Sequence, residues 1–225
     1  MVADLEVPGA AAKLSLSPVM TANLDVTQLE TSQVAESAAV LARAFFDDPA
    51  WLWAIPEDDK RAQVLPWFFR AATRYGLRFG EVHTTGGNVE AAAILLPPKR
   101  ARLHSLSLAR AGLWLMPFKV GLGAFSRFLT MRRTLEERHK LDVPPQHWYV
   151  WLLGVDPPHQ GQGVGSALLR SVTARADRDG VPCYLDTTRE RNLTFYRRHG
   201  FEVVYEGDFP QGGPHLWTLR REPKG

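Results

Sequence analysis

The sequence predicts a mixed α/β domain in which helices pack on a central β-sheet. Three observations lead to this expectation. Residues 147–155 form an apolar run of the kind found in strands that are buried on both faces. A glycine-rich turn at 160–165 follows this run and leads into a helical pattern, with apolar residues at three- and four-residue steps. Further strand-like segments occur before and after this unit, so the helices have a sheet to cover.

The composition indicates one folded domain. The chain has 225 residues, of which 45% are hydrophobic and 23% are charged, enough to bury a core. We expect a flexible N-terminal extension over 1–24 and a single domain over 25–225. No run of 18 apolar residues and no signal-peptide pattern occur, so no membrane span is expected. The one cysteine, Cys183, cannot form an internal disulfide, and a cytoplasmic protein is therefore expected.

The segment before the glycine-rich turn predicts two helices and a hairpin. Apolar residues at helical spacing indicate helices over about 34–46 and 63–79, and Pro49 is expected to mark the end of the first. Two short strands separated by a Gly-Gly pair follow, at about 80–85 and 89–96. The residues before 34 have weak periodicity, so most of them are expected to form a loose extension.

Positive charge is concentrated in one segment. Residues 99–140 contain ten Lys or Arg and two Glu, a balance of +8, whereas the rest of the chain has 17 basic and 22 acidic residues, a balance of −5, which together give +3. Its apolar residues predict extra short helices between the third and fourth strands. A membrane-surface helix, a nucleic-acid patch and a field attracting an anionic ligand are alternatives to an ordinary helical cover with solvated basic side chains. We favour the helical cover, so neither nucleic acid nor membrane is expected as a partner.

The glycine-rich turn has a possible use in binding. Glycines let bare backbone approach a ligand, and the first N–H groups of the following helix lack partners within it. Such donors and the helix dipole suit a phosphate or pyrophosphate. The turn lacks the Gly-Lys-Ser/Thr of a P-loop, and its glycine spacing does not fit the dinucleotide fingerprint, although Asp186 lies near the required distance. Without further motifs, a tight turn that needs glycine for its geometry is the simpler interpretation.

Two motifs together favour a specific family. The first has the pattern Gln/Arg-x-x-Gly-x-Gly/Ala and the second an Asn…Tyr…Gly-Phe ending, carried by Gln160, Gly163 and Gly165, and by Asn192, Tyr196, Gly200 and Phe201. In these residues the chain resembles the GNAT superfamily of N-acetyltransferases. From about Trp148 to the C-terminus it is most similar to the puromycin N-acetyltransferase-like members of that superfamily.

The resemblance implies a central mixed, splayed sheet with acetyl-coenzyme A lying in the opening after the 148–155 strand. It also implies which residues bind the coenzyme, mostly through backbone groups: Leu153, Val155, Gln160, Gly161, Gln162, Gly163, Val164, Gly165, Ser166 and Asn192. No metal is expected.

The resemblance also names candidate catalytic residues. Direct acyl transfer to an amine needs a neutral amine, a stabilised carbonyl oxygen and a proton for the leaving thiolate. Tyr196 would lie near the thioester sulfur and supply that proton. The base is left open between Asp186, at a strand end, and Glu190, before the last helix. Asp186 could instead hold a cationic substrate, and Glu190 could simply stabilise the start of a helix.

The expected function is acetyl-coenzyme A-dependent N-acetylation of a primary amine on a small molecule, such as an amine antibiotic or a metabolite. The protein is expected to act as a monomer or homodimer. Two alternatives remain at this point. A protein or peptide N-acetyltransferase would need an open groove for its substrate, and a non-catalytic acyl-coenzyme A-binding module would show no turnover.

Overall fold

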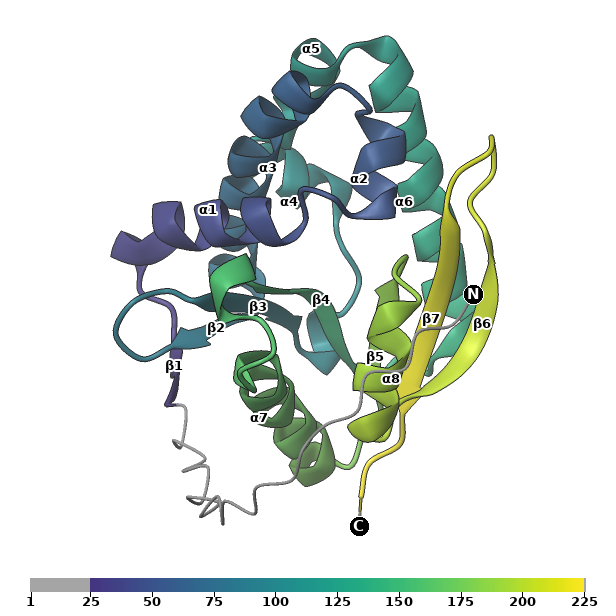
Figure 1. Cartoon of the computed structure of the whole chain (residues 1–225). Coiled ribbons are helices and arrows are strands. Elements are labelled where there is room, and N and C mark those ends of the chain that lie inside the picture. The colour runs from purple at the N-terminus through teal and green to yellow at the C-terminus, as the bar shows by residue number, and fades with distance from the viewer. Residues whose placement is uncertain (1–24, 225) are drawn as a thin grey trace, which may run out of the picture.

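A computed structural model describes residues 25–224, so the extension expected over 1–24 lies outside the described residues. Its centre is a mixed seven-stranded sheet in the order β1-β2-β3-β4-β5-β7-β6 (Figure 1). Neighbouring strands are antiparallel except for β4 and β5, which are parallel. The strands are β1 (Val26–Gln28), β2 (Glu81–Thr85), β3 (Ala91–Leu96), β4 (Trp148–Val155), β5 (Cys183–Thr187), β6 (Glu202–Asp208) and β7 (His215–Arg221).

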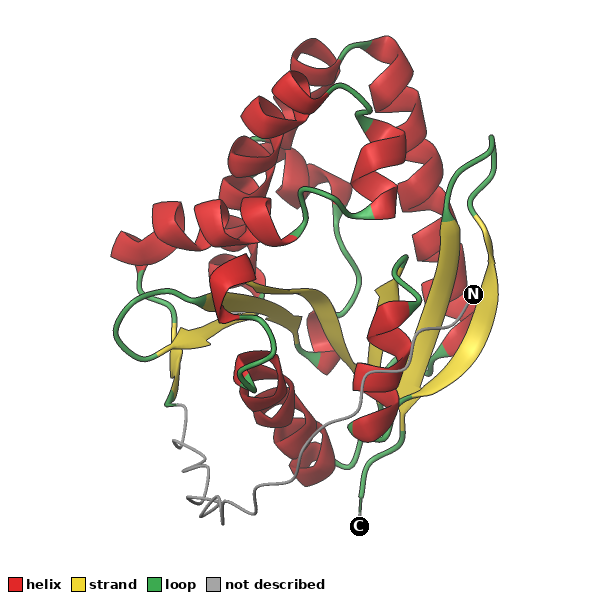
Figure 2. Ribbon diagram, viewed as in Figure 1, coloured by secondary structure: helices red, strands yellow, loops and turns green. Residues whose placement is uncertain are grey.

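Helices cover both faces of this sheet, which confirms the mixed α/β expectation (Figure 2). The first and third helices pack on one face of β3, and the long helix after the glycine-rich turn packs on the other. The helices are α1 (Val34–Ala44), α2 (Pro49–Ala54), α3 (Asp58–Phe79), α4 (Ser105–Arg110), α5 (Met116–Val120), α6 (Leu122–Asp142), α7 (Val164–Asp179) and α8 (Arg191–Arg198).

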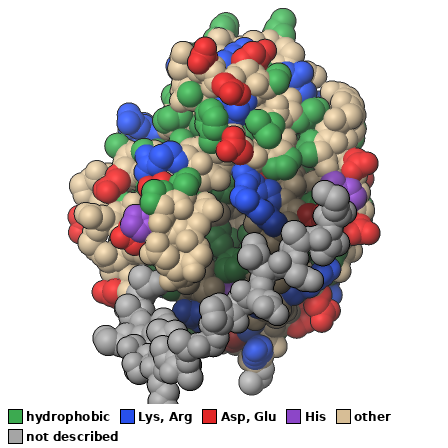
Figure 3. Space-filling view, in the orientation of Figure 1, with side chains coloured by type: hydrophobic (Ala, Val, Ile, Leu, Met, Phe, Trp, Pro, Cys, Tyr) green, Lys and Arg blue, Asp and Glu red, His purple; other side chains and the backbone are tan. Residues whose placement is uncertain are grey.

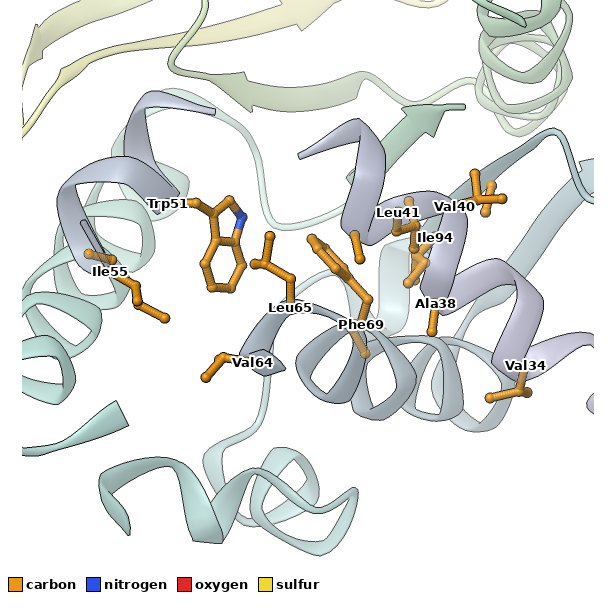
Figure 4. Close-up of a cluster of buried hydrophobic side chains, with 14 of the residues drawn as sticks. Val34, Ala38, Val40, Leu41, Trp51, Ile55, Val64, Leu65, Phe69 and Ile94 are labelled. Atoms are coloured by element: carbon orange, nitrogen blue, oxygen red, sulfur yellow. The ribbon is translucent and has the colours of Figure 1, made fainter. Parts of the chain in front are cut away.

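Strand β3 shows how the sequence sets these layers. All six of its residues are buried, because side chains alternate between two covered faces. Ile94 joins the cluster that α1 and α3 form with side chains such as Leu41 and Phe69 (Figure 4). Ala93 and Leu95 point the other way, into the cluster beneath α7. The core therefore lies on both faces of the sheet.

Two elements near the N-terminus differ from the sequence-based expectation. Val26–Gln28 forms β1 and pairs with β2, where only a loose extension was expected. Pro49 begins α2 instead of only marking where the previous helix ends, which is at Ala44. The physical reason is that proline fits the first helical turn, and Asp48 caps this one by accepting a 3.0 Å hydrogen bond from the Ala50 N–H. A three-residue strand is too short to show a hydrophobic period.

The sheet separates between β4 and β5. These strands pair only over Trp148, Tyr149 and Val150, each matched with one of the first three residues of β5. Beyond that point β4 continues to Val155 on the edge of β3 alone. The β3–β4 register shifts by one residue at Trp151, and such a bulge bends the strand that carries it. The splayed sheet expected from the sequence is therefore present, with its opening after Val150.

The basic segment forms extra helices between β3 and β4, as expected. We call this part, α4 to α6 with its connecting turns (residues 97–147), the inserted segment. Asp142, at the end of α6, fastens it to the far half of the sheet. The buried Asp142 carboxylate accepts a 2.7 Å hydrogen bond from the Thr218 hydroxyl and pairs with Arg138, while its carbonyl accepts from Arg220 at 3.0 Å. No helix within residues 25–224 is long and apolar enough to cross a membrane.

Candidate active site

The glycine-rich turn and the start of α7 form a cradle of backbone donors beside the opening in the sheet. Gly161 and Gly163 have φ angles of +77° and +85°, which side chains other than glycine rarely adopt. A Cβ at either position would project into open space. The first bond inside α7 runs from the Ala167 N–H to the Gly163 carbonyl at 3.0 Å, so the N–H groups of residues 164–166 have no partner within the helix. Together with the helix dipole, these donors suit an anionic ligand.

A cavity of about 430 Å³ lies against this cradle. It is bounded by the free part of β4, the turn before α7, the end of α1 and one face of α8. Most of the binding residues that the sequence predicts line it, namely Leu153, Val155, Gln160, Gly161, Gly163, Gly165, Ser166 and Asn192, and so does the predicted catalytic residue Tyr196. Gln162 instead donates from its side chain to the Pro158 carbonyl at 3.0 Å, and the Val164 side chain is buried in the core.

Charged residues that the motifs did not identify also line this cavity. Arg189, Arg191 and Arg198 reach it from the turn before α8 and from α8 itself, whereas Asp48 is the one carboxylate among its lining residues. Asp48 pairs with Arg189 at 3.2 Å and accepts a 2.8 Å hydrogen bond from the Thr188 hydroxyl. The surplus of positive charge fits an anionic ligand. In the space-filling view, this face is hollowed near its centre, and basic and hydrophobic side chains border the hollow (Figure 3).

Asn192 and Tyr196 share one face of α8, as their four-residue spacing predicts. The Asn192 amide donates to the Thr187 hydroxyl at 3.2 Å, so the side chain is held at the end of β5. Tyr196 is buried and packs against the ring of Phe195 at 5.1 Å. Burial, reinforced by the nearby Asp186 and Asp48 carboxylates, raises the pKa of the Tyr196 phenol well above its usual value. The phenol therefore stays protonated at neutral pH and can donate.

The two candidate bases differ in their surroundings. Asp186 is partly buried and accepts a 2.7 Å hydrogen bond from the Tyr149 hydroxyl. Burial raises the pKa of Asp186 to about 6, against the lowering effect of that hydrogen bond. Glu190 is exposed and stands at the start of α8, and neither carboxyl is among the residues that line the cavity. Of the two, Asp186 has the pKa of a group that changes protonation near neutral pH.

The end of β5 divides the site into two sides. Side chains alternate along the strand, so Tyr184 and Asp186 lie on the face toward Tyr149, whereas Thr187 lies on the face toward α8. The cradle, Asn192 and Tyr196 are on the α7 and α8 side. A ligand in the cradle and a second molecule beside Asp186 would therefore approach the opening from opposite faces of the sheet. Within residues 25–224, no group of three or more His, Cys, Asp or Glu side chains is placed to hold a metal ion.

A comparison with known families identifies the part of the chain that contains this site. Residues 126–203 match the family model of the acetyltransferase (GNAT) domain, a range that holds the cradle, β5 and Tyr196. Over this part of its length, the chain is similar to the GNAT superfamily of N-acetyltransferases. The family implies acetyl-coenzyme A, and the cradle, its open space and the surrounding arginines fit the anionic part of that molecule.

Relatives extend the similarity beyond this range. An uncharacterised N-acetyltransferase of Schizosaccharomyces pombe is 25% identical over 185 residues, covering 80% of this chain and 74% of its own. The N-alpha-acetyltransferase RimI of Mycobacterium tuberculosis is 37% identical over 84 residues, which are 36% of this chain and 52% of its own. Among solved structures, the Drosophila melanogaster polyamine N-acetyltransferase superposes with a TM-score of 0.60 at 16% identity, covering 88% of this chain and 99% of its own. That match shows a shared GNAT fold.

Proposed function

We propose that this GNAT protein transfers the acetyl group of acetyl-coenzyme A to a primary amine of a small molecule. One observation carries the proposal. The cradle and Tyr196 lie on one side of the opening in the sheet. Asp186, near the end of β5, lies on the other side. A donor and an acceptor can therefore meet where β4 and β5 part, without a covalent intermediate on the protein.

The coenzyme would be held mainly by backbone. The N–H groups from Gly161 to Ser166 would contact its pyrophosphate, with Arg191 and Arg198 adding positive charge nearby. The Gln160 N–H already donates to the Pro157 carbonyl at 3.3 Å. Leu153 and Val155 lie on the part of β4 that has no partner on the β5 side, so backbone groups there face the opening. The Val155 carbonyl already accepts a 3.0 Å hydrogen bond from the Gln160 side chain. Asn192, fixed by Thr187, would donate to the arm of the coenzyme.

Two side chains would carry out the proton transfers. When bound, acetyl-coenzyme A supplies a thioester whose carbon–sulfur bond is replaced by the new nitrogen–carbon bond. Asp186 would accept the proton that leaves the amine nitrogen, because its pKa of about 6 leaves the carboxylate ionised at higher pH. The Tyr196 hydroxyl would donate the proton that the sulfur needs. One proton is taken up and one is given, so the transfer is balanced. Glu190 stays an alternative base, acting directly or through a water molecule.

Thiol release from acetyl-coenzyme A tests the proposal directly. The protein is assayed against a panel of amine antibiotics that includes puromycin, together with arylalkylamines, polyamines, amino acids and peptides. We expect amine-dependent thiol release, with the acetylated amine confirmed by mass spectrometry, and size measurements that show a monomer or homodimer. Binding of coenzyme A without turnover on any amine would instead identify a non-catalytic module.

A second candidate is acetylation of a protein N-terminus. The observation that favours it is the 37% identity with the mycobacterial N-alpha-acetyltransferase over 84 residues. Peptides with free and with blocked N-termini distinguish the two functions. Turnover that requires a free peptide N-terminus and exceeds that of every small amine would replace the proposal.

A further inference from the structure

A second cavity, of about 320 Å³, lies between the inserted segment and the sheet. Its walls come from several helices and one strand. Examples are Phe68 of α3, Leu108 of α4, Phe128 of α6 and Trp151 of β4. Most of its lining side chains are apolar, and aromatic rings are frequent among them. Its volume is in the range of a site for a small molecule. Neither of the two motifs that identify the family contributes a residue to it.

The charged groups at this second cavity do not form a cation site. They are Arg102, Arg132 and Glu136. Arg132 donates to the Ser105 hydroxyl at 2.5 Å, which ties α6 to α4. The one carboxylate, Glu136, already has Arg132 at 4.0 Å and Lys140 at 3.4 Å. A second ammonium group on a ligand would therefore meet apolar walls and arginines, and burying an unpaired charge in such surroundings is strongly unfavourable.

Tyr149 connects this second cavity to the opening in the sheet. Its ring lines the cavity, and its hydroxyl donates to the Asp186 carboxylate at 2.7 Å. Asp186 lies on the same face of β5 as Tyr184, which is the face toward the inserted segment. A ligand whose amine is beside Asp186 therefore has the apolar cavity next to it, on the side opposite the cradle.

We propose that the acceptor is a primary amine on a bulky apolar body, aromatic or branched, and that the inserted segment holds this body. The inference rests on the function proposed above and adds a class of acceptor to it. Aromatic rings fit such walls through offset and edge-to-face contacts, as Trp51 already makes with Phe128 at 5.2 Å. Diamines and polyamines are excluded by the same walls, because their second charge finds no partner.

Paired substrates and paired variants of α6 test this proposal. We expect kcat/KM for 3-phenylpropylamine to exceed that for 1,3-diaminopropane by about 10²-fold or more, since a buried unmatched charge is strongly rejected. Leu129 lines the cavity and is 37% exposed, so a carboxylate there should be tolerated by the fold. Leu129→Asp should reduce the preference at least about tenfold, by opposing the phenyl group and attracting the second ammonium.

The matched control is Leu122→Asp, on the same helix. Leu122 is 81% exposed and does not line the cavity, so this variant should keep the wild-type preference. A preference for the diamine, or equal effects of the two variants, would overturn the proposal while leaving the acetyltransferase function in place. If no amine is acetylated, the proposed function fails. Calorimetry with 3-phenylpropylamine then tests the cavity separately. Binding that Leu129→Asp weakens and Leu122→Asp does not would support the cavity as a site, whereas no binding would rule it out.

Discussion

The hydroxyl of Tyr149 donates a 2.7 Å hydrogen bond to the Asp186 carboxylate across the point where β4 and β5 part. The bond holds the carboxylate at the opening, between the coenzyme side and the apolar cavity. Since burial raises the pKa of Asp186 to about 6, this carboxyl is poised to exchange a proton near neutral pH.

Replacing Asp186 by Asn should therefore change both pH dependence and stability. Wild-type kcat/KM should rise as the pH increases through about 6, as Asp186 loses its proton, and Asp186→Asn should be at least about 10²-fold slower at pH 8. The raised pKa means that the folded state holds this proton more tightly than the unfolded state, so wild-type stability falls as the pH rises from the ordinary value of 3.8 to about 6 and levels off above that. The neutral Asn removes that loss and can still accept from Tyr149.

Melting temperatures at pH 5 and pH 8 check the second part of this prediction. The gain in stability from Asp186→Asn should be larger at pH 8 than at pH 5. Unchanged activity at pH 8 would show that the base is another group, with Glu190→Gln as the next variant to assay.

Removing the hydroxyl group of Tyr196 should slow the acetyl transfer without loss of the fold. Tyr196→Phe keeps the ring and its contact with Phe195, so melting temperature and coenzyme affinity should change little. The kcat should fall about 10²-fold, equivalent to about 2.7 kcal/mol, as is usual when one general acid is lost. Tyr184→Phe is the control, because that buried hydroxyl lies near Asp142 at 3.5 Å and not at the cradle. Turnover within twofold of wild type would make Tyr196 a packing residue.

A side chain at Gly163 should block coenzyme binding. Gly163→Val places a β-branched residue at a φ of +85° and fills the open space over the cradle. The control is Gly180→Val at the other end of α7, where φ is +65° and a Cβ also meets open space. Both variants should lose stability through backbone strain, but only Gly163→Val should lose coenzyme A binding in calorimetry. Equal binding by the two folded variants would rule out the cradle.

A buried histidine pair should make the fold sensitive to acid. His139 lies 2.5 Å from His147 between their Nε2 atoms, and burial, with the neighbouring His147 ring, lowers the pKa of His139 to about 3. Between pH 6.5 and 3, the unfolded chain therefore binds this proton and the folded chain does not, so stability falls with the pH. At pH 5 the loss from His139 is about 2 kcal/mol.

Denaturant titrations of wild type and His139→Gln at pH 7.5 and pH 5 measure this loss. The variant can start from a lower stability at pH 7.5, because it loses ring contacts with Tyr149. Its decline from pH 7.5 to pH 5 should nevertheless be smaller than that of the wild type. An equal decline would assign the acid sensitivity to other groups, such as His83, whose pKa is also lowered by burial.

The features that could be predicted from the sequence are those formed by residues close together along the chain. The run from Gln160 to Ser166 and the pair Asn192 and Tyr196 are local patterns, because each lies on one turn or one helix face. The Asp48–Arg189 ion pair joins residues that are 141 positions apart, and no spacing rule connects them. Likewise, the Tyr149–Asp186 bond depends on the register of two parallel strands. The apolar cavity depends on how the inserted segment packs, which its short helices do not specify alone.

The contacts of Asp142 between α6 and β7 limit how the acceptor preference of one homologue can be transferred to another. A chimaera that exchanges residues 97–147 between two homologues would carry over the walls of the apolar cavity. It would also sever the contacts of Asp142 with Thr218 and Arg220, on the strand that pairs with β5. A graft bounded by the inserted segment alone is therefore incomplete, and a working exchange must bring a compatible β7 with it.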